Sequence, residues 1–391
     1  MPRPNREYFK HCAYKNKDDL KVEAEWLRAP SQREKSGMTL ILSNDDVERL
    51  LTMPDCIAVL ENAYRELAHG RGITRRRSDC IAPTTYADDA IYGLKSMDGV
   101  VPSLGVSAVR INSDIVTNPI VGNTQRRVKV PAAPGDRYVG LVLLFSTHNG
   151  EPLAIFPDGV LQHFRVGATN GLGVKYMARE AARTVGILGS GWQAETQLSA
   201  VCAVRHIETI RCFSPNRENR QNFSERMSES LGVEVTPVEQ PEDAVRGADV
   251  VMCATNALGP VFFKSWIEAG MHLSSIKRPE IEADAIRAAD RVVLHTHDPG
   301  PLLSVANGAD YKEEGKWKAG GFDVDQLPTL PQLIDHQVTG RASEEEVTCF
   351  LNNLGMGYQF AAVGSVIYRK AIEEGAGHSL PTDWFTETVH P

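Results

Sequence analysis

Hydrophobic and polar positions follow two different patterns along the 391-residue chain. From about Thr184 onward, short apolar runs alternate with segments of helical length. These runs cover residues 185–188, 209–213, 233–238, 249–254, 272–276 and 291–295. Strands that alternate with helices in this way form a parallel sheet with right-handed crossovers. The pattern therefore predicts an α/β fold with a Rossmann-type parallel sheet domain, which we place at residues 171–329.

The part of the chain before this domain mixes helical and strand-like patterns. Residues 45–70 carry apolar side chains at the spacing of an amphipathic helix. A strand pattern begins at Thr39, and residues 105–111 and 140–145 are further predicted strands. The last of these runs into His148-Asn149-Gly150, a sequence typical of a hairpin turn.

A long helical pattern covers residues 343–375, after about Pro328. We expect this segment to pack back on the first part of the chain. Residues 38–170 and 330–391 are therefore predicted to form one discontinuous α+β domain. The first residues, 1–37, are rich in Lys, Arg, Glu and Asn without apolar periodicity, which is typical of a flexible N-terminal extension.

Composition and charge narrow the class of protein. The formal net charge of −8 gives no general attraction to nucleic acid or to an anionic membrane surface. The sequence contains no apolar run of about 18 residues that could span a membrane. The seven Cys are scattered without paired spacing, which favours a reducing compartment over a disulfide or zinc framework. We expect a cytoplasmic protein.

The turn after residues 185–188 has the residues that a dinucleotide-binding loop needs. It reads Gly189, Ser190, Gly191, Trp192, Gln193 and Ala194, followed by a predicted helix to Val204. The first glycine permits the tight turn, the second lets the backbone approach a pyrophosphate, and the small third residue lets helix and strand pack closely. This strand–loop–helix context predicts a nicotinamide cofactor site. Ala254 and Thr255, at the end of a later strand, are further candidates for it.

The residues at the end of the second predicted strand indicate whether the protein binds NAD(H) or NADP(H). An enzyme that uses NAD usually has Asp or Glu there, bonded to the ribose 2′-hydroxyl. This chain has Phe213 and Pro215 with Ser214, Asn216 and Arg217 instead. These polar residues could hold a 2′-phosphate, so we predict a slight preference for NADP(H) over NAD(H). The alternative is that Arg217 and Arg220 are only solvated residues at a helix start.

Several short motifs occur in a recognisable order. They are the segment 150–154 (Gly-Glu-Pro-Leu-Ala), Arg165-Val166-Gly167-Ala168, the Gly-x-Gly-x-Gln-Ala loop, the segment 340–343 (Gly-Arg-Ala-Ser) and a Gly-rich C-terminal helix. Together they resemble the ornithine cyclodeaminase/mu-crystallin family, from Met38 to about Leu380. The resemblance implies a Rossmann domain that holds NAD(P) next to an amino- or imino-acid pocket. It also implies that the discontinuous domain binds substrate and pairs two copies into a homodimer.

The resemblance points to four cations for the substrate pocket. Arg77 corresponds best to the family's carboxylate-binding arginine, with Arg75 as the alternative register. Lys95 corresponds to the pocket lysine, which would orient or protonate the reacting centre, and Arg110 is the alternative for that position. Arg165 corresponds to the arginine that precedes the Rossmann domain, although Val-Gly replaces the usual Thr-Ala after it. A guanidinium at a domain cleft is suited to holding an α-carboxylate.

Two departures from the family pattern separate the possible activities. Cyclodeaminases carry an Asp in the loop after the fifth Rossmann strand, but residues 274–280 contain none, although Glu280 and Glu282 are nearby. Residues 352–359 lack the acid that many relatives carry. His295 and His297 resemble a metal pair without an identifiable third ligand, so no metal is predicted.

We therefore predict an NAD(P)-dependent oxidoreductase that acts on the C–N bond of a small amino or imino acid. It would be a ketimine reductase or an amino-acid dehydrogenase. The first alternative is an ornithine cyclodeaminase-type ammonia lyase that uses NAD catalytically. The second is a non-catalytic cofactor- and ligand-binding protein of the mu-crystallin kind.

Overall fold

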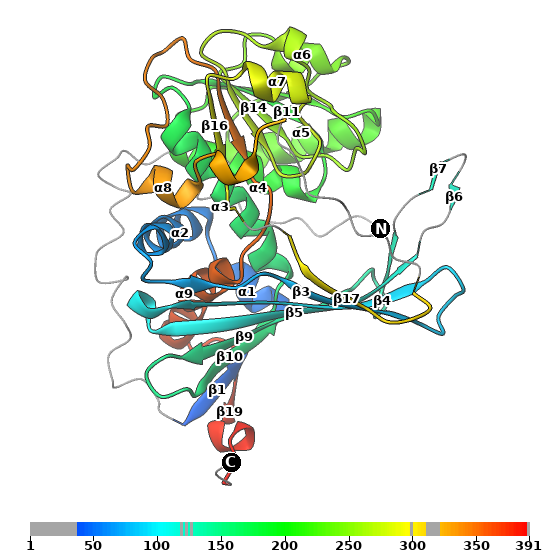
Figure 1. The fold of residues 1–391 in the computed structure, drawn as a ribbon, viewed down its shortest axis with the longest axis vertical. Helices are drawn as coiled ribbons and strands as arrows, with labels where there is room; N and C mark the ends of the chain where they lie inside the picture. The colour runs from blue at the N-terminus through cyan, green and yellow to red at the C-terminus, as the bar shows by residue number, and fades with distance from the viewer. Residues whose placement is uncertain are drawn as a thin grey trace.

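The computed structural model describes residues 37–117, 120–121, 124–125, 128–297, 300–309 and 321–388. Nearly all of the predicted N-terminal extension, residues 1–37, lies outside these ranges. The described residues form two large sheets, one above the other, with helices between and around them (Figure 1). Within the described residues, no helix is long and apolar enough to cross a membrane.

The upper sheet in Figure 1 is parallel throughout, in the order β13-β12-β11-β14-β15-β18-β16. Its strands are β11 (Thr184–Leu188), β12 (Thr209–Phe213), β13 (Val235–Pro237), β14 (Val250–Cys253), β15 (His272–Ser275), β16 (Arg291–Leu294) and β18 (Thr348–Leu351). Its helices are α4 (Trp192–Val204), α5 (Arg217–Leu231), α6 (Pro241–Val245) and α7 (Ala283–Ala288), with a short 3-10 turn η2 (Lys264–Trp266). Six strands lie at the six predicted apolar runs, which confirms the α/β fold with a Rossmann-type sheet.

The seventh strand corrects the sequence prediction. Residues 343–375 were expected to be helical, but β18 (Thr348–Leu351) lies between β15 and β16, and all four of its residues are buried. A central strand of a parallel sheet is buried on both faces, so its short apolar run carries no alternation that would separate it from a helix. The C-terminal part of the chain thus contributes to both sheets, since α9 (Gly357–Glu374) follows directly and packs on the other one.

The lower sheet is mixed and mostly antiparallel, in the order β17-β3-β4-β5-β9-β10-β1-β19. Its strands are β1 (Met38–Ile41), β3 (Ser78–Pro83), β4 (Ile91–Val101), β5 (Val106–Thr117), β9 (Val139–Ser146), β10 (Pro152–Pro157), β17 (Leu302–Val305) and β19 (His378–Pro381), with β2 (Ile73–Thr74) and β8 (Val128–Val130) paired at its side. A separate hairpin joins β6 (Ile120–Val121) and β7 (Thr124–Gln125). The predicted turn at residues 148–150 does join two antiparallel strands, β9 and β10, and Gly150 has a φ of +80°.

Helices cover the face of this sheet that looks toward the Rossmann sheet. They are α1 (Asn44–Leu50), α2 (Met53–Ala68) and α9, and α8 (Leu330–Ile334) lies close by. Elsewhere in the structure, short 3-10 turns occur at η1 (Pro102–Leu104), η3 (Val324–Gln326) and η4 (Thr382–Phe385). The single helix predicted at residues 45–70 is two helices. Thr52 caps the second one and Pro54 stands in its first turn, where proline is tolerated but cannot continue a preceding helix.

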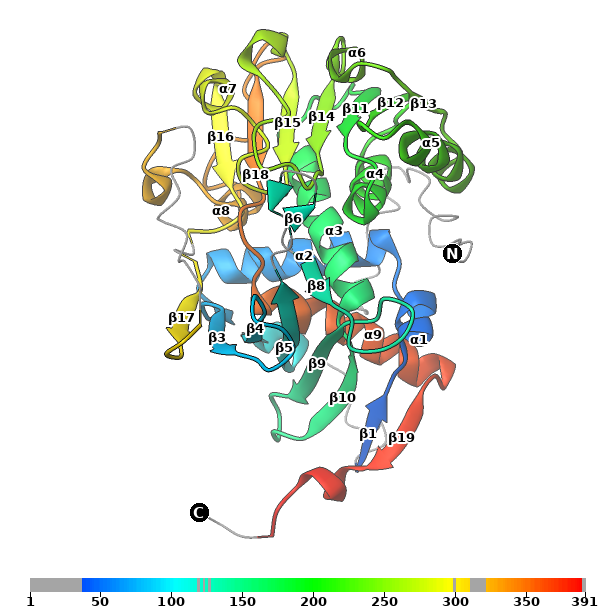
Figure 2. The same ribbon diagram turned by 90° about the vertical axis from the view of Figure 1, so that its right-hand side faces the viewer.

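The helix α3 (Gly159–Met177) connects the two sheets and positions the site (Figure 2). It packs against α4 of the Rossmann sheet and against α2 and α9 of the other part. Gly167 allows the close approach to α4, because a Cβ there would lie 2.5 Å from the carbonyl oxygen of Thr196. A residue on α3 can therefore contact the dinucleotide loop and the substrate domain at the same time.

Candidate functional site

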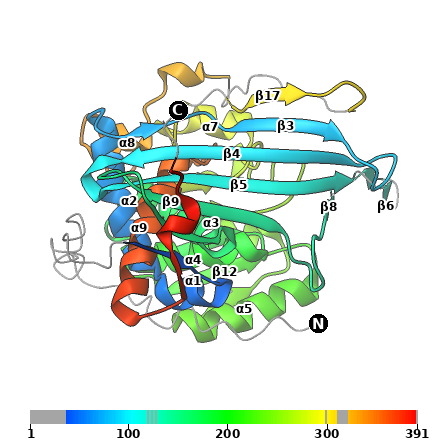
Figure 3. The same ribbon diagram turned by 90° about the horizontal axis from the view of Figure 1, so that it is seen from below.

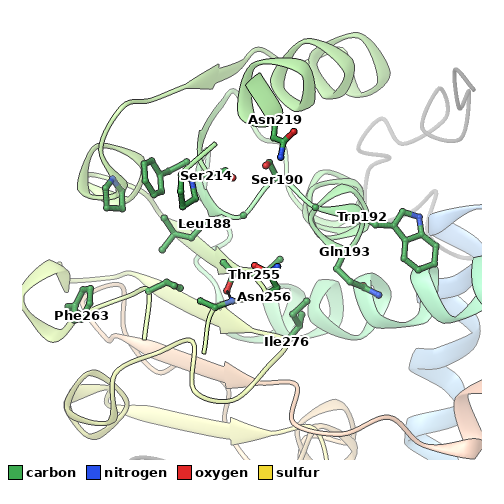
Figure 4. A pocket seen from close by; sticks show the side chains of 18 of the residues that line it. Leu188, Ser190, Trp192, Gln193, Ser214, Asn219, Thr255, Asn256, Phe263 and Ile276 are labelled. Carbon is green, nitrogen blue, oxygen red and sulfur yellow. Dashed lines mark hydrogen bonds between the residues drawn. The ribbon is translucent and has the colours of Figure 1, made fainter. Parts of the chain in front are cut away.

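A cleft opens at the carboxyl ends of β11, β12 and β14, where a Rossmann sheet binds its ligand. It has a volume of about 570 Å³. Its lining includes Leu188, Gly189, Ser190, Gly191, Trp192, Gln193, Phe213, Ser214, Pro215, Asn219, Pro241, Ala254, Thr255, Asn256, Phe263, Trp266 and Ile276 (Figure 4). Ser190, Ser214 and Thr255 were predicted from the sequence, whereas Asn219, Asn256 and Ile276 belong to no motif and were not predicted.

The glycines of the loop have the geometry that a dinucleotide requires. Gly189 has a φ of +120°, and a Cβ there would lie 2.1 Å from the carbonyl oxygen of Ala254, so only glycine fits. A Cβ on Gly191 would meet nothing within 4 Å, so its backbone faces open space at the N-terminus of α4. Ala194 is completely buried in the first turn of α4. The unpaired N–H groups at this helix start fit the pyrophosphate of a dinucleotide.

Trp192 is held from outside the cleft by a histidine of α3. Its indole stacks on the imidazole of His163, with ring centroids 4.0 Å apart, and the Nε2 atom of His163 hydrogen-bonds the carbonyl oxygen of Trp192. In Figure 4 the Trp192 side chain points away from the centre of the cleft. Trp192 therefore anchors the loop to α3, whereas Ser190 and the loop backbone face the cleft.

The residues that were predicted to bind a 2′-phosphate occupy different positions relative to the cleft. Ser214 and Asn219 line the cleft. The side chain of Asn216 caps α5 by accepting a hydrogen bond from the Asn219 amide at 2.8 Å, and Arg217 is exposed in the first turn of α5. Arg220 is not the solvated residue of the alternative interpretation, because it is 3% exposed and donates to the carbonyl oxygen of Ser214 at 3.0 Å.

The predicted substrate residues of the lower sheet lie on its helix-covered face. Antiparallel register places Asp79 opposite Lys95, and Lys95 opposite Asn112. One step along the strands, Met97 lies opposite Arg110. Lys95 and Arg110 thus lie on neighbouring strands and on the same face of the sheet. These two residues are the alternatives that the sequence offers for the pocket lysine.

Each of these cations has its own carboxylate. The guanidinium of Arg77 makes a two-point contact with Asp79 at 2.7 and 2.8 Å. The Lys95 ammonium lies 2.9 Å from Asp114, and Arg110 donates to Asp158 at 2.6 Å.

The three carboxylates are buried within the fold. Burial raises the pKa of Asp114, but hydrogen bonds from Lys129 and Lys95 outweigh it and hold that pKa below its ordinary value. Asp114 therefore stays ionised beside Lys95.

Arg75 and Arg76 are not comparable candidates. Arg75 is an exposed residue that pairs with Asp98 at 2.7 Å. Arg76 is exposed as well and donates to the carbonyl oxygen of Gly300 at 2.9 Å. Arg77 is thus the least exposed of the three arginines.

Arg165 differs from the other cations. It is 6% exposed, and no acidic partner pairs with it among the described residues. Its Nη1 donates to the Oε1 of Gln359 at 3.1 Å, its guanidinium lies over the ring of Phe360, and its buried Nε has no hydrogen-bond partner. Burial, followed by the nearby charge of Arg110, lowers the pKa of Arg165 to about 10, so it remains a cation at neutral pH.

A buried hydrogen-bond chain fixes the position of Gln359. The Nε2 of Gln359 donates to the Tyr64 hydroxyl at 2.9 Å, and that hydroxyl lies 2.8 Å from Nε2 of His295. The other ring nitrogen of His295 bonds the carbonyl oxygen of Leu354. Because burial lowers the pKa of His295 to about 3, this histidine is neutral and acts as a structural link. Among the described residues, no group of three or more potential ligands could hold a metal ion.

Comparison with known proteins identifies the family. The pattern of the ornithine cyclodeaminase/mu-crystallin family matches residues 38–375. The chain belongs to this family. It is similar to a Δ1-pyrroline-2-carboxylate reductase of Bacillus cereus, with 28% identity over 87% of this chain and 99% of that protein. An alanine dehydrogenase of Archaeoglobus fulgidus is 27% identical over 88% of this chain and 98% of its own length.

The fold of the family is shared as well. The structure of Thermococcus litoralis Δ1-pyrroline-2-carboxylate reductase in complex with NADH and L-proline matches this chain with a TM-score of 0.72 and 27% identity. The match covers 88% of this chain and 100% of that one. These family members span nearly the whole described structure, so both sheets, and the helix α3 between them, belong to the common architecture.

Proposed function

We propose that this chain is an NAD(P)-dependent oxidoreductase that acts on the C–N bond of a small amino or imino acid in the cytoplasm. The observation that carries the proposal is Arg165, a buried cation without an acidic partner among the described residues. A buried charge without compensation is costly, so a ligand carboxylate at this guanidinium would be strongly favoured. Arg165 and the anchor of the dinucleotide loop, His163, lie on the same helix.

Different residues of this chain would bind the cofactor, bind the substrate carboxylate and donate a proton. Gly189, Gly191 and the start of α4 would hold the dinucleotide pyrophosphate. Arg165 would hold the α-carboxylate, with Arg77 as a second cation. When bound, the nicotinamide supplies or accepts the hydride. Lys95, paired with Asp114, would orient the reacting C–N group or donate a proton to its nitrogen.

The similarity to named relatives supports this activity class. By their names, one relative reduces Δ1-pyrroline-2-carboxylate and the other is a dehydrogenase of alanine, and each matches this chain over most of its length. The loop after β15 also favours a reductase over a cyclodeaminase. Its one fully buried acid, Glu280, accepts hydrogen bonds from Thr255 and from two backbone amides of its own loop, so its carboxylate is already engaged by the protein.

NADP(H) is proposed as the slightly preferred cofactor. Residues 214–217, directly after β12, contain no acid, Ser214 lines the cleft, and Arg217 is exposed in the first turn of α5. A guanidinium at this position would contact the 2′-phosphate of NADPH, whereas NADH has no phosphate at that place. We expect Arg217→Ala to weaken NADPH binding several-fold and to leave NADH binding unchanged. Equal effects on both cofactors would refute the assignment.

A homodimer is proposed through the outer face of the lower sheet. On this face Leu94 lies opposite Ser113, and Ile111 lies opposite Leu141. Leu94, Val139 and Leu141 are each about 40% exposed. Figure 3 shows β3, β4 and β5 in front of α2 and α9, so these strands turn this face away from both helices. An exposed apolar sheet face of this kind is typical of a subunit interface.

Purified protein with reduced cofactor tests the activity. NADH and NADPH are offered separately with cyclic imino acids, and with 2-oxo acids mixed with ammonia or methylamine. Loss of the reduced nicotinamide absorbance with any of these imines would support the proposal. Cofactor binding without turnover on the whole panel would favour a binding protein.

A further inference from the structure

Glu280 is a completely buried carboxylate in the loop between β15 and α7. One carboxylate oxygen, Oε1, accepts hydrogen bonds from the backbone amide of Thr255 at 2.5 Å and from its hydroxyl at 2.9 Å. The other, Oε2, accepts from the backbone amides of Ile276 and Lys277, both at 3.1 Å. All four donors belong to segments that directly follow two neighbouring strands, β14 and β15.

The two segments that Glu280 joins form one wall of the dinucleotide cleft. Thr255 and Ile276 both line it, whereas Glu280 does not (Figure 4). The main chain of Glu280 adds a third segment, because its carbonyl oxygen accepts from the amide of Val261 at 2.7 Å, and Val261 is also part of the lining. Glu280 therefore accepts hydrogen bonds from three segments that line the cleft, although it does not line the cleft itself.

Only an ionised carboxylate matches this set of donors. It offers two acceptor oxygens and no donor, so all four N–H and O–H groups are satisfied. A glutamine amide would place an NH₂ group against at least one pair of donors and would leave them unpaired. No cation pairs with Glu280 among the described residues; the Nζ of Lys277 donates to the carbonyl oxygen of Ala257 instead. Burial raises the pKa of the carboxyl group, and these hydrogen bonds oppose the rise.

We propose that Glu280 is a positioning residue for the cofactor: it sets the affinity for the nicotinamide dinucleotide by holding Thr255 and Ile276 in place, without touching the ligand. The inference rests on the proposed function, since the cleft must bind such a dinucleotide. It goes beyond that function because it assigns the affinity to a residue outside the lining.

The test compares three full-length variants with the wild type. Glu280→Gln keeps the size and removes the charge, and Glu280→Asp keeps the charge on a side chain one methylene shorter. Glu282→Gln is the matched control: it removes an acid two positions away whose carboxylate caps the amide of Lys264 at 2.8 Å and has no hydrogen bond to Thr255 or Ile276. The readouts are NADH and NADPH affinity by fluorescence, the KM of an accepted imine, and the melting temperature without cofactor.

We expect Glu280→Gln to weaken dinucleotide binding at least 10-fold and to change the KM of the imine less than 2-fold at saturating cofactor. Glu280→Asp should recover part of the affinity, because it can still accept from one of the two segments. Glu282→Gln should bind as the wild type does.

Two results would overturn the inference. One is a folded Glu280→Gln variant that binds the dinucleotide as tightly as the wild type. The other is a variant with lowered melting temperature in which cofactor affinity and imine KM change equally, which would indicate a general structural role. A wild type that binds neither NADH nor NADPH would instead contradict the proposed function itself, so the two failures are distinguishable.

Discussion

The imidazole of His163 and the indole of Trp192 are stacked, with 25° between their planes. One residue belongs to α3 and the other opens α4 directly after the glycine loop. Because α3 also carries Arg165, the dinucleotide loop and the proposed carboxylate site share one rigid helix.

His163→Ala should weaken dinucleotide binding by about 2- to 10-fold, since an aromatic pair contributes about 0.5–1.5 kcal/mol beyond its buried area. The loss arises because Trp192 no longer has a surface to pack on and the loop becomes less ordered. Titration of the variant with NADH and NADPH measures it. His206→Ala, at an exposed site, is the control, and an unchanged affinity in His163→Ala would show that the stack does not support the loop.

Arg165→Met should raise the KM of the imine by about 10- to 100-fold, because hydrogen bonds to charged groups contribute about 1.5–3 kcal/mol. Cofactor affinity should stay within 2-fold of the wild type. The melting temperature should not fall, because the substitution also removes a buried charge that has no ion-pair partner among the described residues. Arg165→Lys keeps the charge without the two-point geometry and should be intermediate. An imine KM that is unchanged in Arg165→Met would remove Arg165 from the pocket.

Stability should fall as the pH is lowered from about 6.5, partly through His272. Burial lowers the pKa of His272 to about 3 from 6.5, so between these values the unfolded chain binds the proton and the folded chain does not. Folding is therefore favoured above pH 6.5 and loses about 1.4 kcal/mol per pH unit below it for each such histidine.

His272→Leu should reduce this slope by one histidine's share. The Thr348 hydroxyl, which bonds His272 in the wild type, still donates to the carbonyl oxygen of Met177. The free energy of unfolding at pH 7 and pH 5 measures the slope, with the exposed His206→Gln as control. An identical slope in wild type and His272→Leu would show that His272 is not responsible.

Leu141→Lys should convert the proposed homodimer into a monomer, because it places a charge at the centre of the exposed apolar face of the lower sheet. The molar mass in solution, by sedimentation or light scattering, measures the change. Leu258→Lys is the matched control: Leu258 is 79% exposed and follows β14 in the Rossmann part. A monomeric wild type, or a dimeric Leu141→Lys variant, would place the interface elsewhere.

The Rossmann part was predictable because its signals are local. The strand at 184–188, the glycines after it and the start of α4 are neighbours in sequence, so periodicity and loop chemistry suffice to place them. The strand β18 was not predictable in this way. Its four residues insert between β15 and β16 from a position more than 50 residues later in the chain, and only the tertiary fold decides that.

The candidate cations were predictable, but their partners were not. Arg77, Lys95, Arg110 and Arg165 stand out by residue type and by resemblance. The pairing of Lys95 with Asp114 depends on the register of β4 and β5, and that of Arg110 with Asp158 joins residues 48 positions apart. A shift of one residue in register would turn every side chain to the other face. The structure is therefore needed to show that Arg77, Lys95 and Arg110 are each paired with a carboxylate. Arg165 has no such pair among the described residues.

The central claim is a net transfer of reducing equivalents to a C–N bond. The most direct measurement follows nicotinamide absorbance and ammonia together, in one reaction with an accepted imine of the panel and reduced cofactor and in another with ornithine and catalytic NAD. We predict stoichiometric oxidation of the cofactor in the first reaction and no ammonia in the second. Ammonia and proline from ornithine without net change of cofactor would contradict the account and identify a cyclodeaminase.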